Sequence, residues 1–236
     1  PPTPLPLIYP LTHSSTIYAQ VAIKVISRRS APEGYLDKFL PREIKALRQV
    51  SHPHITALLD AVHTSEHVFL VMQYASGGDL LDYINKGGAL SEQRARVVFY
   101  QLLDAIGHCH QQGIYHRDLK CENILLDDKS NVLLSDFGFA TVVDSPTTYL
   151  MTHCGSYAYA APEILDGRPY HGDRSDLWSL GVVLYAMTCG RLPFRDKTVK
   201  LLLDDIRRGV SFPRTLSRSE LIMCVCVCVC VCVREG

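Results

Sequence analysis

Two short polar motifs constrain this chain more than any other feature of its sequence. The first runs from His116 to Asn123 (HRDLKCEN), and the second, Asp136-Phe137-Gly138, begins thirteen residues after Asn123. Each lies beside a short apolar run typical of a strand, so both motifs are expected on neighbouring loops. Together they present two carboxylates, one amide and one lysine. That set is needed to hold a metal-bound nucleotide and to deprotonate a hydroxyl beside it.

The first part of the chain predicts strands and one helix. Residues 20–26 (QVAIKVI) alternate well enough for a strand in which Lys24 is the odd polar member. Apolar residues between 36 and 50 follow helical spacing, and we expect regular helix from Pro41, since proline is tolerated in a first turn. Residues 55–59 and 68–72 predict two more strands, and residues 75–78 (ASGG) predict a hinge.

Longer helices are predicted after the hinge. Ser91 is a suitable cap for an apolar-periodic helix that ends near Gly113. Residues 124–126 and 132–134 predict a hairpin between the two motifs, residues 139–160 a Ser/Thr/Tyr-rich loop, and residues 176–189 a buried helix. Strands first and helices second, with a glycine hinge between them, predict two lobes that face a cleft.

The charge balance excludes some classes of partner. Lys+Arg and Asp+Glu number 24 each, so no excess charge indicates nucleic acid or an anionic membrane as a partner.

The longest apolar run, residues 221–233, is shorter than the roughly 20 residues of a membrane-spanning helix. No charged-then-apolar signal segment opens the chain, and its first residue is Pro rather than Met, so we expect a fragment or an imperfect gene model.

Five of the nine cysteines alternate with valine between residues 224 and 233. Zinc sites use gaps of two to four residues between ligands, whereas strict alternation places these thiols on one face of an extended strand. The favoured interpretation is a translated TGTGTG repeat, and the alternative is a thiol-rich metal or redox tail. The other four cysteines are scattered, as expected for a reduced, cytoplasmic protein.

We also expect the protein to be a monomer.

Six motifs occur in an order that resembles a eukaryotic protein kinase over residues 21 to about 213. They are Val21–Lys24, Glu43, His116–Asn123, Asp136–Gly138, Ala161–Glu163 and Asp176–Gly181. Residues 39–43 (FLPRE), 116–123 and 159–163 (YAAPE) are similar to the testis-specific serine/threonine kinases. The resemblance implies an α+β, bilobal protein-kinase-like fold with a truncated small β lobe and a mainly helical large lobe. The segments would be a Pro-rich lead-in (1–20), the small lobe (21–75), an incomplete large lobe (76–213) and an aberrant tail (214–236).

The resemblance also implies a serine/threonine protein kinase that uses ATP and Mg²⁺. Asp118 would accept the proton of the incoming hydroxyl, and Lys120 would offset charge on the transferring phosphoryl group. Asn123 and Asp136 would supply oxygen ligands to Mg²⁺. Lys24 would hold the α- and β-phosphates, fixed by an ion pair to Glu43.

The same resemblance implies a nucleotide pocket and a substrate preference. The adenine would lie between Ala22 and Leu125, with Met72 at the back and the backbone of Gln73 to Ala75 along its edge; for Met72, plain core packing is the alternative. Asp79 and Glu122 match acidic positions that contact ribose or a basic substrate side chain, which implies Ser/Thr substrates with upstream Arg or Lys. Two solvated carboxylates are the alternative.

Further positions match regulatory and structural elements of the family. A phosphate on Thr152 would pair with Arg117 and order the loop, with Thr147 and Thr148 as other candidates and unmodified exposed threonines as the alternative. Asp176 would anchor the backbone of the first motif from below. The stacked spine between the lobes would comprise Leu47, Leu58, His116 and Phe137.

The sequence departs from the kinase pattern at both ends. The Gly-rich loop expected before Lys24 is missing, since Gly34 is the first glycine, and without glycines no backbone approaches the phosphates so closely. After Pro213 the family would continue with further helices, where this chain has Cys-Val repeats. Three hypotheses follow: an ATP-dependent kinase in truncated form, a pseudokinase-like binding module, or a fragment that does not fold alone. For these 236 residues we expect weak activity or none.

Overall fold

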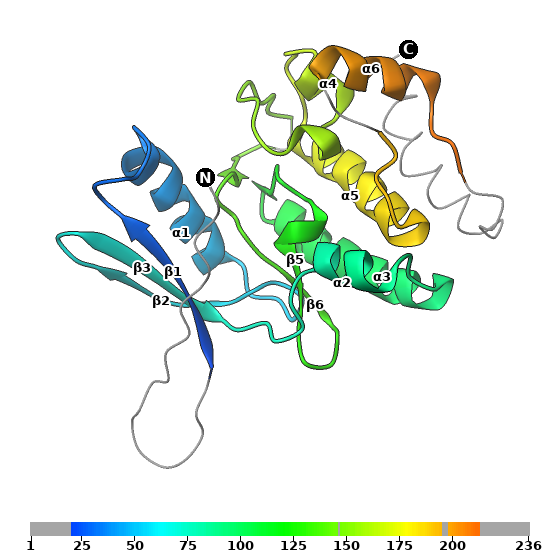
Figure 1. The fold of residues 1–236 in the computed structure, drawn as a ribbon. Coiled ribbons are helices and arrows are strands. Elements are labelled where there is room, and N and C mark those ends of the chain that lie inside the picture. The colour runs from blue at the N-terminus through cyan, green and yellow to red at the C-terminus, as the bar shows by residue number, and fades with distance from the viewer. Residues whose placement is uncertain (1–19, 146, 195–197, 213–236) are drawn as a thin grey trace.

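The computed structural model describes residues 20–145, 147–194 and 198–212, and it has two lobes (Figure 1). The small lobe contains an antiparallel sheet in the order β1-β3-β2, formed by β1 (Val21–Ser27), β2 (Leu58–His63) and β3 (His67–Gln73). The large lobe is mainly helical, so the α+β class is confirmed. The Cys-Val repeat and most of the Pro-rich lead-in lie outside the described residues.

One helix is shared by the cores of both lobes. The π-helix η1 (Tyr35–Phe39) leads into α1 (Leu40–Gln49), and Pro41 lies in the first turn of α1, as predicted. Leu40 packs in the small-lobe core, whose buried residues include Ile26 and Val68. Ala46 and Leu47 belong instead to the large core cluster. The helix that carries Glu43 is therefore held from both sides of the molecule.

The strand predicted for residues 55–59 was wrong by three residues at its start. Ile55 lies in a turn, where its N–H donates to the carbonyl of His52 at 3.1 Å, and it forms a parallel bridge with Leu134 of the large lobe. The side chain of Ile55 is buried in the large core, whereas Leu59 is 57% exposed. The apolar run spans two different environments, so hydrophobicity alone placed the strand too early.

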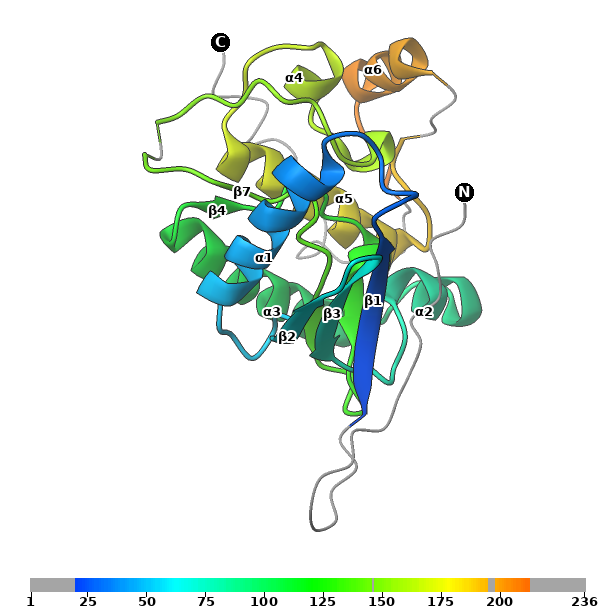
Figure 2. The ribbon, with the colours of Figure 1, turned by 90° about the vertical axis from the view of Figure 1, so that its left-hand side faces the viewer.

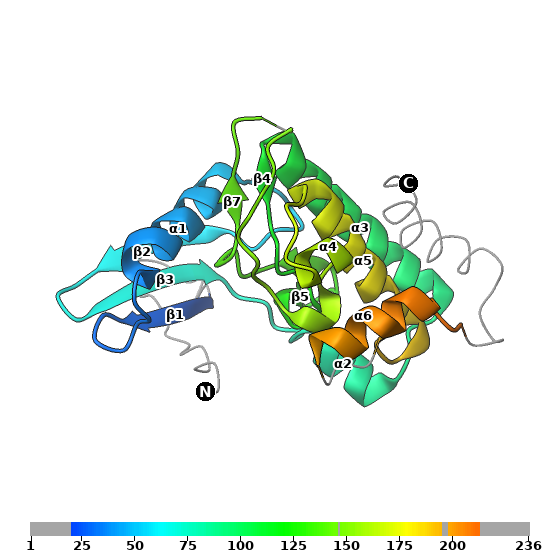
Figure 3. The same cartoon turned by 90° about the horizontal axis from the view of Figure 1, so that it is seen from above.

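The large lobe is built around two long helices (Figure 3). Ser91 caps α3 (Glu92–Gln111) by accepting from the N–H of Arg94 at 3.3 Å, as predicted. Of the residues of α5 (Gly172–Cys189), fourteen are buried. That helix begins four residues before the predicted start, because its first turn is polar and the apolar pattern does not include it. Gly172 permits this start: a Cβ there would lie 2.3 Å from the Tyr115 ring.

Shorter elements complete the large lobe. Helix α2 (Leu80–Gly87) follows the hinge, and α4 (Pro162–Leu165) and α6 (Val199–Arg208) lie side by side above α5 in the view of Figure 1. β5 (Ile124–Leu126) and β6 (Val132–Leu134) form the predicted hairpin. The predicted loop 139–160 also contains a short strand, β7 (Thr141–Val142), which pairs with β4 (Ile114–Tyr115), and the 3-10 turn η3 (Tyr157–Tyr159) (Figure 2). None of the helices in the described ranges combines the length and the apolar character needed to cross a bilayer.

Candidate active site

The first motif forms a tight loop between β4 and β5, and Asp176 of α5 holds its backbone. The two oxygens of Asp176 accept from the N–H groups of His116, at 2.9 Å, and Arg117, at 2.8 Å. The Asp176 side chain is fully buried, and its Oδ2 also lies 2.8 Å from Nε2 of His110. Arg117 has a positive φ of 65°, which is rare for a residue with a side chain. The structural task predicted for Asp176 is therefore confirmed.

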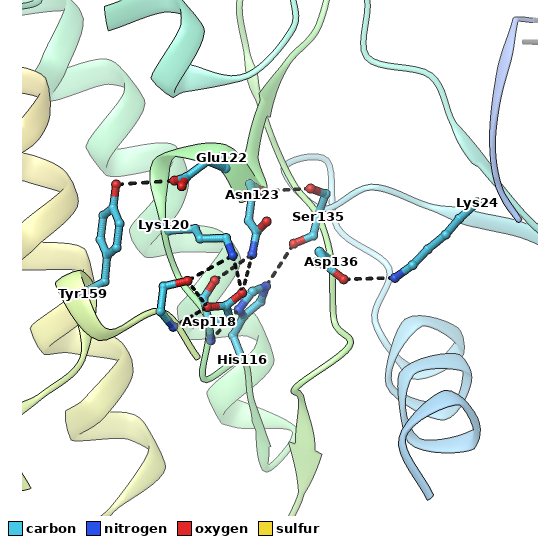
Figure 4. Close-up of polar contacts among 10 residues, drawn as sticks. Lys24, His116, Asp118, Lys120, Glu122, Asn123, Ser135, Asp136 and Tyr159 are labelled. Atoms are coloured by element: carbon cyan, nitrogen blue, oxygen red, sulfur yellow. Dashed lines mark hydrogen bonds and ion pairs between the residues drawn. The ribbon is translucent and has the colours of Figure 1, made fainter. Parts of the chain in front are cut away.

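Asp118 lies at the centre of this loop and is almost completely buried (Figure 4). Its Oδ2 is 2.8 Å from Nζ of Lys120 and accepts from Nδ2 of Asn123 at 3.1 Å. Its Oδ1 accepts from the N–H of Ser156 at 2.9 Å and from the hydroxyl of Ser156 at 3.0 Å. The Lys120 ammonium donates to that hydroxyl at 3.1 Å. A carboxylate, an ammonium and an aliphatic hydroxyl thus share one contact network.

Asn123 and Asp136 offer the oxygen atoms that suit Mg²⁺. Asn123 uses its amide nitrogen to donate to the backbone carbonyl and Oδ2 of Asp118, which leaves its amide oxygen as the atom a metal would bind. Ser135 joins the two motifs, since its N–H (2.9 Å) and hydroxyl (3.0 Å) both donate to the carbonyl of Asn123. Asp136 follows directly, with a positive φ of 61°. An amide and a carboxylate on adjacent loops fit Mg²⁺, which retains waters and phosphate oxygens as further ligands.

Lys24 of β1 reaches across to the second motif. Its Nζ lies 2.7 Å from Oε1 of Glu43 and 3.1 Å from Oδ1 of Asp136, so the predicted ion pair with Glu43 is present (Figure 4 shows the contact with Asp136). Burial lowers the pKa of Lys24, but the carboxylates of Glu43 and Asp136 outweigh it and hold the pKa above its usual range. For Asp136, burial raises the pKa, but Lys24 outweighs it and the pKa lies below its usual range. Both groups are therefore charged at neutral pH.

The residues predicted to line the nucleotide pocket come from both lobes. Ala22 and Met72 are partners across β1 and β3, and Met72 packs against the small-lobe core. Leu125 lies on β5 in the large lobe, half-buried. The N–H of Gln73 already donates to the carbonyl of Ala57 at 2.9 Å. Of the predicted backbone edge, the Gln73 carbonyl and the residues up to Ala75 remain as candidates to meet a base.

Asp79 and Glu122 lie on the large-lobe side of the hinge and carry different contacts. Asp79 is the N-cap of α2 and accepts from the N–H of Asp82 at 2.8 Å, while its backbone bridges to Leu125. Glu122 is exposed and accepts from the Tyr159 hydroxyl at 3.4 Å. The capping contact explains why Asp79 is aspartate without reference to a ligand. A substrate role for the pair stays a prediction.

The arginine of the first motif points toward the loop that contains Thr152. Its Nε donates to the carbonyl of Phe139 at 2.8 Å, and its guanidinium donates to the Tyr170 hydroxyl at 3.4 Å. That hydroxyl in turn donates to the carbonyl of Thr152 at 2.8 Å, and the Thr152 residue is exposed. Arg117 and Thr152 are thus linked through Tyr170, and the predicted phosphate contact stays a prediction.

The four predicted spine residues all lie in or against the core. The His116 and Phe137 rings meet edge to face with their centroids 4.8 Å apart, and Nε2 of His116 lies 3.1 Å from the carbonyl of Ser135. Leu47 is buried in the large core cluster and Leu58 packs against it.

The sequence did not predict three contacts within the candidate site. His110 touches Asp176, Ser156 touches Asp118, and the Tyr35 hydroxyl donates to Oε2 of Glu43 at 3.3 Å. Each contact joins residues that are distant in the sequence or separated by a change of helix type, so no local spacing indicates it. For Ser156, its position shortly before Tyr159–Glu163 was the one available signal.

Comparison with known proteins agrees with this arrangement. The family described as protein kinase domain matches residues 9–223. Testis-specific serine/threonine-protein kinase 5 of Mus musculus is 47% identical over 207 residues, which are 85% of this chain and 56% of that protein. Testis-specific serine/threonine-protein kinase 3 of Homo sapiens is 46% identical over 202 residues, 85% of this chain and 75% of that protein. Serine/threonine protein kinase OSK3 of Oryza sativa subsp. indica is 43% identical over 199 residues, 84% of this chain and 39% of that protein.

The chain thus spans about half the length of the first of these relatives and three-quarters of the second. The motifs that converge in the structure lie inside the matched region. From the family match and these identities, the chain belongs to the eukaryotic protein kinases and is close to the testis-specific serine/threonine kinases.

Proposed function

We propose that this chain transfers the γ-phosphate of ATP to serine or threonine hydroxyls of protein substrates, with Mg²⁺ as cofactor. One observation carries the proposal furthest. Asp118 already holds a serine hydroxyl of its own chain at 3.0 Å, and Lys120 contacts the same oxygen at 3.1 Å. A substrate hydroxyl in an equivalent position would have a proton acceptor and a cation beside its oxygen at once.

Asp118 acts on the attacking hydroxyl. Its carboxylate accepts the hydroxyl hydrogen bond, orients the oxygen and takes its proton as that oxygen forms the new bond. Asn123 keeps the carboxylate in place through its amide nitrogen, and Asp176 keeps the whole loop in place. Lys120 stabilises negative charge as it develops beside the same oxygen. Each of these groups is set before substrate arrives, which avoids reorganisation during the reaction.

Asn123 and Asp136 are the residues that would hold Mg²⁺, and Lys24 would hold the nucleotide phosphates. When bound, Mg-ATP supplies the phosphoryl group and a metal charge that neutralises the phosphate oxygens. Lys24 is prepared for this by Glu43, which keeps its ammonium charged and pointed toward Asp136. Ala22, Met72 and Leu125, with the backbone from Gln73 to Ala75, would enclose the adenine.

A preference for basic residues upstream of the target Ser/Thr follows from two acidic side chains. Glu122 is exposed within the catalytic loop (residues 116–123), and the Asp79 carboxylate caps α2. Arg or Lys side chains of a bound peptide would meet this charge. We also propose a cytoplasmic monomer that acts on proteins rather than on nucleic acid or membranes, in keeping with the balanced charge.

The binding-module hypothesis receives less support than the enzyme. The relatives named above are all serine/threonine-protein kinases. The residues needed for phosphate transfer are also joined by hydrogen bonds. One joins Lys24 to Asp136, and two others join Ser135 to Asn123 and Asn123 to Asp118.

The test is phosphate transfer from Mg-ATP to a serine peptide with upstream arginines, beside a matched peptide with upstream glutamates. The intact chain should prefer the basic peptide, and Asp118→Asn should lower its transfer rate by about 10³-fold, since general-base catalysis contributes roughly 10²–10⁴-fold. Asp128→Asn changes an exposed carboxylate in the same lobe and should leave the rate unchanged. Equal rates for wild type and Asp118→Asn would refute the proposed function, and equal rates for the two peptides would refute the basic preference.

A further inference from the structure

Glu43 carries two carboxylate oxygens that face different partners. Oε1 accepts from the Lys24 ammonium at 2.7 Å, and Oε2 accepts from the Tyr35 hydroxyl at 3.3 Å. The Glu43 side chain is only 1% exposed, so solvent contributes little to either oxygen. Because a buried carboxylate oxygen without a donor is costly, the Tyr35 hydroxyl is well placed to fix the orientation of the carboxylate.

The second oxygen of Glu43 also lies close to the second motif. A Cβ added at Gly138 would lie 3.6 Å from Oε2 of Glu43 and 3.2 Å from Oδ1 of Asp136. The backbone of the second motif at Gly138 therefore lies close to the carboxylates of both Glu43 and Asp136.

The Tyr35 ring is held in place without help from its hydroxyl. Gly34 precedes the π-helix with a φ of 72°, a conformation that suits glycine, and the N–H of Tyr35 donates to the Pro32 carbonyl at 3.0 Å. The ring stacks with Phe39 at a centroid distance of 6.4 Å and an interplanar angle of 16°. It also packs against the small-lobe core. A phenylalanine would keep all these contacts and lose only the hydrogen bond.

We propose that Tyr35 is a positioning residue that acts through Glu43 on Lys24. Its hydroxyl holds the Glu43 carboxylate so that Oε1 faces the ammonium. Lys24 then divides its contacts between Glu43 and Asp136 instead of pairing with Asp136 alone. An undivided Lys24–Asp136 pair would compete with Mg²⁺ for the same carboxylate. This proposal rests on the function proposed above, to which it adds a further residue.

A titration effect accompanies this geometry. Burial, followed by the negative charge of Glu43, raises the pKa of Tyr35 to about 12. The phenol is therefore neutral over the physiological range and keeps the hydrogen that it donates.

The experiment compares Tyr35→Phe with Tyr100→Phe, which removes the hydroxyl of a 61% exposed tyrosine on α3. The first readout needs no nucleotide: acetylation of Lys24 by acetic anhydride, followed by mass spectrometry, with exposed Lys129 as internal reference. Since an ion-paired ammonium reacts slowly, Tyr35→Phe should speed Lys24 acetylation by about 3- to 10-fold, and Tyr100→Phe should not. The second readout is steady-state kinetics, where the KM for Mg-ATP should rise by a similar factor while the KM for peptide stays unchanged.

Glu43→Gln shows whether Tyr35 acts through Glu43. In that background, Tyr35→Phe should add no further change in Lys24 acetylation, because the partner carboxylate is already gone. Unchanged Lys24 reactivity in Tyr35→Phe, or a full additional effect in the Glu43→Gln background, would overturn the proposal. Faster Lys24 acetylation in a chain whose wild type transfers no phosphate would sink the proposed kinase activity and leave the positioning role supported.

Discussion

The catalytic loop and the Lys24 clamp are two halves of one candidate site, but they are built differently. The loop of residues 116–123 belongs to the large lobe. Its Asp118 and the Asp176 of α5 that holds its backbone are both buried. The clamp of Lys24, Glu43 and Asp136 joins residues that are 19 and 112 positions apart, and its lysine is 33% exposed. The loop is therefore held by contacts within one lobe, whereas the clamp depends on how the two lobes meet.

This difference predicts how each half responds to damage. A change at Asp176, which holds the backbone of the catalytic loop, should lower both the stability of the protein and the rate of phosphate transfer, because the same buried group supports both. A change in the clamp should weaken nucleotide binding and leave the loop in place. A change at the junction between the lobes should have a smaller effect that depends on pH.

The largest effect is expected for Asp176→Asn. The amide would offer one oxygen to two backbone N–H groups and turn a donor toward the other, in a fully buried place. We expect a loss of about 3 kcal/mol of unfolding free energy and roughly 100-fold slower phosphate transfer. Urea denaturation and peptide kinetics measure the two. Asp128→Asn, an exposed carboxylate, should stay within about 0.5 kcal/mol of wild type, and similar curves for both variants would show that the loop does not depend on Asp176.

A smaller and more selective effect is expected for Lys24→Met. Loss of the ammonium removes a phosphate contact and leaves the buried Glu43 without its cation, so affinity for Mg-ATP should fall by roughly 10- to 100-fold. Peptide affinity should not change, since the loop contacts remain. Calorimetric titration with Mg-ATP checks this, with Lys129→Met as the matched exposed lysine. Equal weakening of peptide binding would mean that the loop and the clamp are one unit.

The smallest effect concerns His52, which links the chain before β2 to α3. Burial lowers its pKa, Asp104 at 3.2 Å opposes this, and the nearby His108 and His54 add to the lowering. Because the folded-state pKa lies below the ordinary value of 6.5, the unfolded chain binds more protons, and stability falls as the pH drops below about 6.5. His52→Gln should show a weaker loss of denaturation midpoint between pH 7.5 and pH 5.5 than wild type. An identical pH dependence in the two proteins would exclude His52 as its source.

The sequence predicts the catalytic loop better than the clamp, because the loop residues lie within one contiguous motif. Asp118 and Asn123 lie within one contiguous motif, and the Ser91 cap and the 124–134 hairpin follow from local spacing. The pairing of Lys24 with Glu43 came from the resemblance to kinases, since nothing local in β1 indicates a partner in α1.

The misses share a different cause. The apolar run at 55–59 was assigned to one strand, although Ile55 is buried in the other lobe. Tyr35 lies in a π-helix, where the spacing to Glu43 does not follow the usual 3.6-residue period. The first outcome depends on packing between the lobes and the second on a change of helix type, and a linear hydrophobic pattern contains neither.

The backbone reversal at Arg117 has a consequence for how much three consecutive residues can do. With φ at 65°, the chain turns so sharply that neighbouring side chains diverge. His116 meets the Phe137 ring, Arg117 reaches the Phe139 carbonyl, and Asp118 turns to the Ser156 hydroxyl. One sharp turn thereby directs three consecutive side chains to three separate neighbours, so the Phe137 ring, the segment at Phe139 and the Ser156 hydroxyl are all contacted from residues 116–118.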